Sequence, residues 1–335
     1  MSVNTAIGLV AVAAQDDKDT PATAPAFSHG LTGGQVFKLD RSVESTSVSC
    51  GVRAGTDSYV AGIATGADYD TLGYSDVLPL YLWAAMGNIA SSAAETSGLF
   101  KHVITLGDVL PYLTLWGRIG NEYTRTDGCK LDQLEIEFEG NKPLQFGVTL
   151  IGLGAELGLD SIPGTGDPSC FDGYFVCTGG SFKLETLGDT PVAAPITKGS
   201  LTIANSCETS QFAGQITPGA VDEGKVKTSG AVTVKPDDLG LYKKMVTGSA
   251  SGTTPTGVIV YGSFEYEFKH SQLPGHVLRM KSARVPFTCD FPEVKPDGGA
   301  AELEFKFDDI GIAERNGSPV EFTVTNATQQ YASAA

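Results

Sequence analysis

The chain contains the segment Asp76-Val77-Leu78-Pro79-Leu80-Tyr81-Leu82-Trp83-Ala84-Ala85-Met86-Gly87, whose pattern returns as Asp237-Asp238-Leu239-Gly240-Leu241-Tyr242-Lys243-Lys244-Met245-Val246-Thr247-Gly248. Both segments read D-x-L-x-L-Y-x5-G. In each, apolar residues recur at the spacing of one helix face, an Asp is available to cap the start, and a Gly suits the left-handed turn at the end. The sequence therefore predicts one short helix in each half of the chain.

The spacing of these segments indicates a duplicated domain. Asp76 and Asp237 are 161 residues apart. A second pattern, L-x-F-x4-I-G, occurs at 144–152 and again at 303–311, an offset of 159 residues. Two independent landmarks thus agree to within two residues, at a period far longer than that of a solenoid repeat.

A third pair of similar segments does not have the same offset of about 160 residues. The strand-like residues 37–40 match 182–185 at an offset of 145 residues. The alternative counterpart of the first strand is 200–203, and the sequence leaves the choice open.

Composition favours short strands over helices. The chain has 335 residues, with 41 Gly, 17 Pro and 19% charged residues. Such a chain is rich in turns and poor in the residues typical of helical proteins. We therefore expect a mainly β protein, long enough for two ordinary cores.

The clearest strand signal is a hairpin in which apolar and acidic residues alternate. Residues 134–139 read L-E-I-E-F-E, and a turn leads into 144–148. A second copy runs through 285–291 and 303–307. Alternation of this kind predicts one buried and one solvated face. Two long polar loops are expected at 54–73 and 208–227, and loops of this length usually make contacts.

The net charge of −16 argues against a protein that grips nucleic acid by neutralising phosphates, although acidity also simply keeps a protein soluble. No apolar run approaches the length of a membrane span. The apolar run at 6–14 lacks preceding basic residues, so a mobile or partner-bound arm is favoured over a cleaved leader. We expect that arm to gain order only against a neighbour, and the strand-like 320–325 to pair with another subunit's sheet.

No chemical site is predicted. Carboxylates sit at strand spacing, and the four histidines show no metal-binding pattern, so we expect no catalytic residue, no metal and no cofactor. Six cysteines are too few for a disulfide scaffold, but Cys170 and Cys177 flank a short loop and are a possible disulfide.

Taken in order, these features resemble the tail tube (major tail) proteins of long-tailed, siphovirus-type bacteriophages and related viruses. The resemblance spans nearly the whole chain. It is carried by the arm at 20–23, Leu-Thr-Gly-Gly at 31–34, Leu78 to Tyr81 with Gly87, and the segments 98–102, 110–114, 127–132 and 241–248.

The resemblance implies two tandem tail-tube-type β-sandwich domains, each with one packed helix, plus extended arms. The expected divisions are an N-terminal arm 1–33, tube domain 1 at 34–155, a linker 156–180, tube domain 2 at 181–312 and a C-terminal arm 313–335. Such domains join side by side into rings that stack into a tube. Two domains per chain favour a trimer with pseudo-sixfold symmetry. The alternative is six chains per ring, with the extra domain on the outside.

The resemblance also implies a virion tail protein that is assembled in the host cytoplasm and bound at the tube ends by other tail proteins. DNA would slide through the bore without specific binding, because carboxylates repel phosphates. Candidate lumen-lining residues are Glu135, Glu137, Glu139, Glu265, Glu267, Glu302 and Glu304. An outer-surface position for them remains open. Candidate contacts between rings are Thr56, Asp57, Tyr69, Asp70, Glu208 and Gln215.

Two other functions stay open at this point. A secreted or surface β-sandwich adhesin that binds glycans should be monomeric. A carbohydrate-active enzyme would need two carboxyl groups converging in a cleft.

Overall fold

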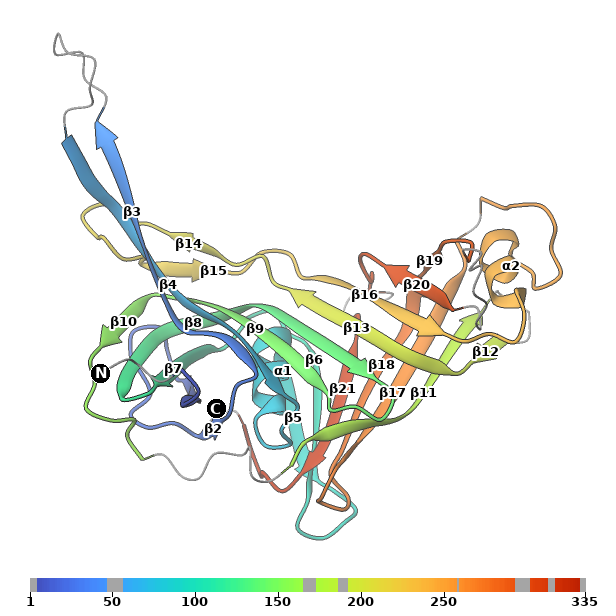
Figure 1. The fold of residues 1–335 in the computed structure, drawn as a ribbon, viewed down its shortest axis with the longest axis horizontal. Coiled ribbons are helices and arrows are strands. Elements are labelled where there is room, and N and C mark those ends of the chain that lie inside the picture. The colour runs from blue at the N-terminus through green and yellow to red at the C-terminus, as the bar shows by residue number, and fades with distance from the viewer. Residues whose placement is uncertain are drawn as a thin grey trace.

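The fold is known from a computed structural model, which describes residues 5–46, 57–164, 173–185, 192–257, 259–292, 302–312 and 317–331. Antiparallel strands dominate these residues, and two short helices accompany them (Figure 1). The expected mainly β architecture is therefore confirmed.

Most strands belong to two large sheets. The first sheet contains β1 (Gly8–Gln15), β2 (Phe27–His29), β3 (Gly33–Thr46), β4 (Asp57–Leu72), β7 (Tyr112–Ile119), β8 (Glu122–Glu139), β9 (Gln145–Gly152), β10 (Gly154–Leu157), β13 (Ile196–Ala204), β16 (Lys227–Val234), β19 (Thr288–Cys289) and β20 (Leu303–Phe307). The second sheet contains β5 (Gly87–Ala93), β6 (Phe100–Leu106), β11 (Phe175–Glu185), β12 (Val192–Ala194), β17 (Tyr261–His270), β18 (Val277–Pro286) and β21 (Glu321–Asn326). The short pair β14 (Glu208–Ser210) and β15 (Ala220–Asp222) forms a separate hairpin.

The two halves of the chain contain the same order of paired strands in the first sheet. In the N-terminal half the order is β3-β4-β9-β8, and in the C-terminal half it is β13-β16-β20-β19. β13 pairs with β16 as β3 pairs with β4, so 200–203, and not 182–185, occupies the place of the first strand. The segment 182–185 lies in β11, in the second sheet.

The two predicted helices are present. α1 (Leu78–Met86) ends at Gly87 with φ of 87°, and α2 (Gly240–Thr247) ends at Gly248 with φ of 80°. Both glycines adopt the left-handed conformation that a residue with a Cβ avoids. The helix starts differ from the prediction, because Val77 and Leu239 occupy the N-cap positions and their own side chains make no capping hydrogen bond. In α2 the carboxylate of Asp238, one residue earlier, accepts a hydrogen bond from the N–H of Gly240 at 2.6 Å.

The helices pack differently. Every residue of α1 except Trp83 is buried, and the helix contacts β8 of the first sheet and β5 and β6 of the second. It thus fills the space between the sheets of the N-terminal half. In α2 only Leu241 and Lys244 are buried, so this helix lies at the periphery. The C-terminal half is filled mainly by aromatic side chains, with ring contacts among Phe182, Phe264, Phe287, Phe305 and Phe307.

The segments expected to be arms belong to the sheets of their own chain. β1 pairs with β7 along its whole length, and Val10, Ala11 and Val12 are fully buried. β21 lies between β18 and β6 in the second sheet. Because the main-chain groups of β1 and β21 already pair within the chain, neither segment waits for a neighbour to become ordered.

The expected loop at 54–73 is largely β4, which pairs with β3 in a long hairpin that stands out from the body of the molecule (Figure 1). β14 and β15 lie within the second expected loop, 208–227. The β3–β4 hairpin contacts the β14–β15 hairpin, because the N–H of Ile63 donates a hydrogen bond to the carbonyl of Ile216 at 2.9 Å.

Candidate functional site

The two halves of the chain are joined by direct strand pairing in the first sheet. Residues 133–139 of β8 pair with 198–204 of β13, with Glu137 opposite Ser200. The sheet therefore runs without a break from β4 in one half to β20 in the other (Figure 1). No strand edge is left bare at this junction, and its backbone groups are satisfied.

An aromatic side chain anchors the junction. The ring of Phe138 is 5% exposed and makes edge contacts with Tyr266 and Phe268 of β17, at centroid distances of 4.4 and 5.3 Å. Opposite it in β13 is Gly199, where an added Cβ would come within 2.4 Å of the ring. Phe138 thus links the first sheet of one half to the second sheet of the other.

An acidic surface covers the other face of the first sheet in the N-terminal half. Glu135, Glu137 and Glu139 are exposed, while Leu134, Ile136 and Phe138 between them are buried. The alternation expected from the sequence therefore exists as a solvated face and a buried face.

Strand β4 extends this acidic face. Gly147 of β9 pairs with both Asp70 of β4 and Glu135 of β8, so the two carboxylates flank a position that has no side chain. Asp68, two residues along β4, is also exposed. We refer to Asp68, Asp70, Glu135, Glu137 and Glu139 together as the acidic face.

The continuation of this face in the C-terminal half carries balanced charges. Glu304 forms an ion pair with Lys306 at 3.2 Å, and Glu302 lies 3.6 Å from Lys235. Lys198 of β13 stands opposite Glu139 in the register. Glu302 and Glu304 thus each have an ammonium group nearby, whereas on the acidic face Glu139, beside Lys142, is the one carboxylate with an ion pair among the described residues.

Two of the expected lumen residues lie elsewhere. Glu265 and Glu267 belong to β17 of the second sheet. A hydrogen bond from Arg279 holds the pKa of Glu267 below its usual value, and the two groups are 2.9 Å apart. These two residues do not share a surface with Glu135.

The residues expected to contact another ring are dispersed. Asp57 lies at the start of β4 in the projecting hairpin, while Glu208 and Gln215 are exposed on the β14–β15 hairpin. Tyr69 is 1% exposed, and its hydroxyl lies 2.6 Å from that of Tyr81, so it belongs to the core. Asp70 belongs to the acidic face. Thr56 lies outside the described residues, as does Cys170, so the Cys170–Cys177 disulfide stays a prediction.

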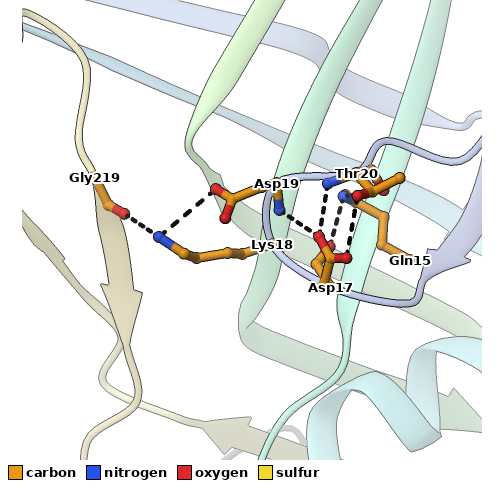
Figure 2. A network of polar contacts seen from close by, with 6 residues as sticks. All are labelled: Gln15, Asp17, Lys18, Asp19, Thr20 and Gly219. Carbon is orange, nitrogen blue, oxygen red and sulfur yellow. Dashed lines mark hydrogen bonds and ion pairs between the residues drawn. The ribbon is translucent and has the colours of Figure 1, made fainter.

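The N-terminal segment contacts the projecting β14–β15 hairpin. Nζ of Lys18 donates a hydrogen bond to the carbonyl of Gly219 at 3.2 Å (Figure 2). The turn that presents Lys18 is built on Asp17, whose carboxylate accepts hydrogen bonds from the N–H groups of Asp19 and Thr20, both at 2.8 Å. The N-terminal segment thus helps to position a projection from the C-terminal half.

Sequence reasoning missed Asp68 and assigned Asp70 to a loop. A signal was present, because residues 67–71 read A-D-Y-D-T, with the acidic residues on alternate positions as in 134–139. The role of Phe138 had no local signal, since its contacts come from strands far along the chain.

Comparison with known proteins identifies one family. A family profile described as "Phage tail tube protein" matches residues 3–324. No curated protein matches the chain. Among the residues that the structure describes, no helix is long and apolar enough to cross a membrane, and no group of three metal-binding side chains comes together.

Proposed function

The chain belongs to the phage tail tube protein family, and we propose that three copies of it close into each ring of the tube. Membership makes it a structural protein of the virion tail that assembles with itself into a tube. The family is structural, and nothing in the described part of the chain favours a glycan-binding adhesin.

The pairing of β8 with β13 carries the proposal of three chains per ring. It sets two sets of strands of the same order, β3-β4-β9-β8 and β13-β16-β20-β19, side by side in one sheet. We infer that the halves are two copies of one tube domain. Three such chains would supply six domains to a ring. A ring of six chains would place the C-terminal half on the outside, which fits poorly with a half that continues the same sheet.

The acidic face is the proposed wall of the bore. It lies on the side of the first sheet that faces away from the second sheet, and its carboxylates are exposed. Glu302 and Glu304 would lie on the same wall but with their charges paired, whereas Glu265 and Glu267 would face outward. Glu139 is paired with Lys142, but across the described residues the other four carboxylates of the acidic face have no ion-pair partner. These carboxylates repel DNA phosphates, so the DNA would slide without binding.

The projecting β3–β4 and β14–β15 hairpins are the proposed contacts between stacked rings. They carry exposed apolar side chains that a single chain leaves uncovered, including Val43 at 56%, Tyr59 at 51% and Ile216 at 56% exposure. Covering such side chains on the next ring would stabilise stacking.

Electron microscopy of the purified, polymerised chain tests this function. We expect hollow tubes or stacked rings, and a mass per ring of three chains. Rings of six chains would contradict the proposed stoichiometry while leaving the tube itself intact. Isolated monomers at all salt and protein concentrations would contradict both.

A further inference from the structure

In the first sheet, the run of strands β3-β4-β9-β8-β13-β16-β20-β19 ends in β3 on one side and in β19 on the other. Across the described residues, β3 has β4 as its one partner strand, and β19 has β20. An edge with bare N–H and C=O groups is a template for pairing with another chain. The chain itself shows what covers such an edge, because β8 and β13 are the internal equivalents of β19 and β3.

The equivalence can be followed residue by residue through the strand registers. Glu135 pairs with Gly147 of β9, and Thr288 pairs with Lys306 of β20. Gly147 and Lys306 are separated by the 159-residue offset of the repeated L-x-F-x4-I-G pattern. Thr288 therefore takes the place of Glu135, Asp290 that of Glu137, and Phe291 that of Phe138.

The same comparison shows that β3 of the N-terminal half corresponds to β13 of the C-terminal half. Gly33 pairs with Asp70 of β4, and Ser200 pairs with Ala231 of β16. Asp70 and Ala231 are 161 residues apart, as the two helix segments are. Gly33 therefore corresponds to Ser200, and Thr32 to Gly199.

The exposure of Phe291 indicates that another strand packs against the β19 edge in the assembled protein. It is 61% exposed, and its ring contacts Tyr242 of α2 at a centroid distance of 5.2 Å. Its counterpart Phe138 is 5% exposed, since β13 and β17 cover it. The same aromatic residue is thus buried where the next domain is present and exposed where the chain offers none.

We propose that the β19 edge, with Phe291, binds β3 of a second copy of the chain in the register of the internal β8–β13 junction, with Gly33 opposite Asp290. This inference rests on the proposed ring and names the two surfaces that close it. The contact is heterologous, because each chain offers β19 to one neighbour and β3 to the other, so repeated contacts close a ring.

The contact between chains is shorter than the internal junction. Pro286 and Pro292 bound the β19 edge, and proline has no N–H to donate to a neighbouring strand. Pairing is therefore confined to residues 287–291, whereas the internal junction runs over 133–139. A short edge between prolines limits uncontrolled pairing, so a single contact between two chains is weak until the ring closes.

Disulfide trapping tests the register. We would introduce Gly33→Cys and Asp290→Cys together, in a Cys289→Ser background, and oxidise the assembled protein. Directly opposed residues of antiparallel strands lie close enough for a disulfide. We expect covalent dimers and trimers on a non-reducing gel, which reducing agent returns to monomers. The matched control is Glu137→Cys with Ser200→Cys in the same background, which should form a disulfide within one chain and no covalent oligomer.

A second variant tests the anchor. Phe291→Asp should change the melting temperature of the unassembled chain little, because the side chain is 61% exposed there and its ring contact is with Tyr242 at the periphery. It should lower the yield of rings at equal protein concentration on the order of tenfold or more, as loss of an interface anchor does.

The outcomes separate this inference from the proposed function. If rings form, but the 33–290 pair gives no covalent oligomer or Phe291→Asp assembles normally, the proposed edge contact is contradicted and the tube function stands. If the wild-type chain forms no ring or tube under any condition, the proposed function itself fails.

Discussion

Lys130 and Glu223 form an ion pair that joins the two halves of the chain at the base of the β14–β15 hairpin. The side chain of Lys130, on β8, is 4% exposed, and its ammonium group also lies 4.6 Å from the centroid of the Tyr112 ring. Burial alone would raise the pKa of Glu223, but the hydrogen bonds from Lys130 and from the N–H of Leu110 outweigh it, so its pKa is lowered.

Removing the carboxylate of this pair should destabilise the protein. Glu223→Ala leaves the Lys130 ammonium buried without its counter-ion, at a cost of about 3 kcal/mol in the free energy of unfolding. Urea denaturation measures the change. The control is Lys225→Ala, which removes an exposed pair with Asp309 and should have little effect. Equal effects of the two variants would mean that the Lys130–Glu223 pair does not stabilise the junction.

The paired phenylalanines should respond differently in the unassembled chain. Phe138→Ala empties a buried aromatic site between β13 and β17, so we expect a loss of about 3–4 kcal/mol. Phe291→Ala removes an exposed ring and should cost less than about 1 kcal/mol. Thermal or urea unfolding at low protein concentration compares the two. A large effect of Phe291→Ala on the monomer would show that this ring serves the fold of its own chain.

His29 should make stability depend on pH. It is fully buried, with Nε2 2.8 Å from the Tyr81 hydroxyl, and burial lowers its pKa from 6.5 to about 4. The unfolded chain binds this proton more tightly than the folded one, so the stabilisation is complete above pH 6.5 and is lost as the pH falls toward 4. Between pH 7.5 and pH 5 the loss from this group should be about 2 kcal/mol.

The comparison of wild type with His29→Gln isolates that contribution. The pKa values of His102 and His276 are also lowered by burial, and both residues remain in the variant. Urea unfolding from pH 7.5 to pH 5 should show a shallower decline for His29→Gln. Parallel pH profiles would contradict the assignment.

Charge reversal on the acidic face should make assembled tubes retain DNA. Glu135, Glu137 and Glu139 would be changed together to Lys, which turns a repelling wall into one that binds phosphates. We expect short duplex DNA to sediment with the tubes at low salt and to be released at high salt. The matched control changes Glu265, Glu267 and Glu321 of the second sheet to Lys, with the same change in net charge. Equal retention by both variants would place the acidic face outside the bore.

The sequence predicted the two helices and the β8–β9 hairpin, because the structure of each depends mainly on residues that are close together in the chain. The helices α1 and α2 follow from apolar spacing and from Gly87 and Gly248, and the β8–β9 hairpin follows from strict alternation. β4 was read as a loop because its first residues stand in a hairpin exposed on both faces, where burial imposes no alternation.

Pairing between distant segments could not be predicted in this way. β1 is buried on both faces, so its apolar run looks the same as that of a leader or a docking arm. Glu137 lies opposite Ser200 because β8 and β13 pair, and these strands meet only in the folded chain. The same is true of the Tyr266 side chain that covers Phe138. The acidic face was therefore predicted in part, and its boundary with the charge-paired half was not.

During translation β6 is synthesised long before β21, the strand that pairs with the edge of β6 in the folded chain. A nascent chain can complete the first sheet of its N-terminal half while the second sheet still has a gap between β6 and β18. Strands that wait for a distant partner fold slowly and leave sticky edges exposed in the meantime. A chain truncated before β21 would keep the facing edges of β6 and β18 free, so such products would be prone to pair with other unfinished chains.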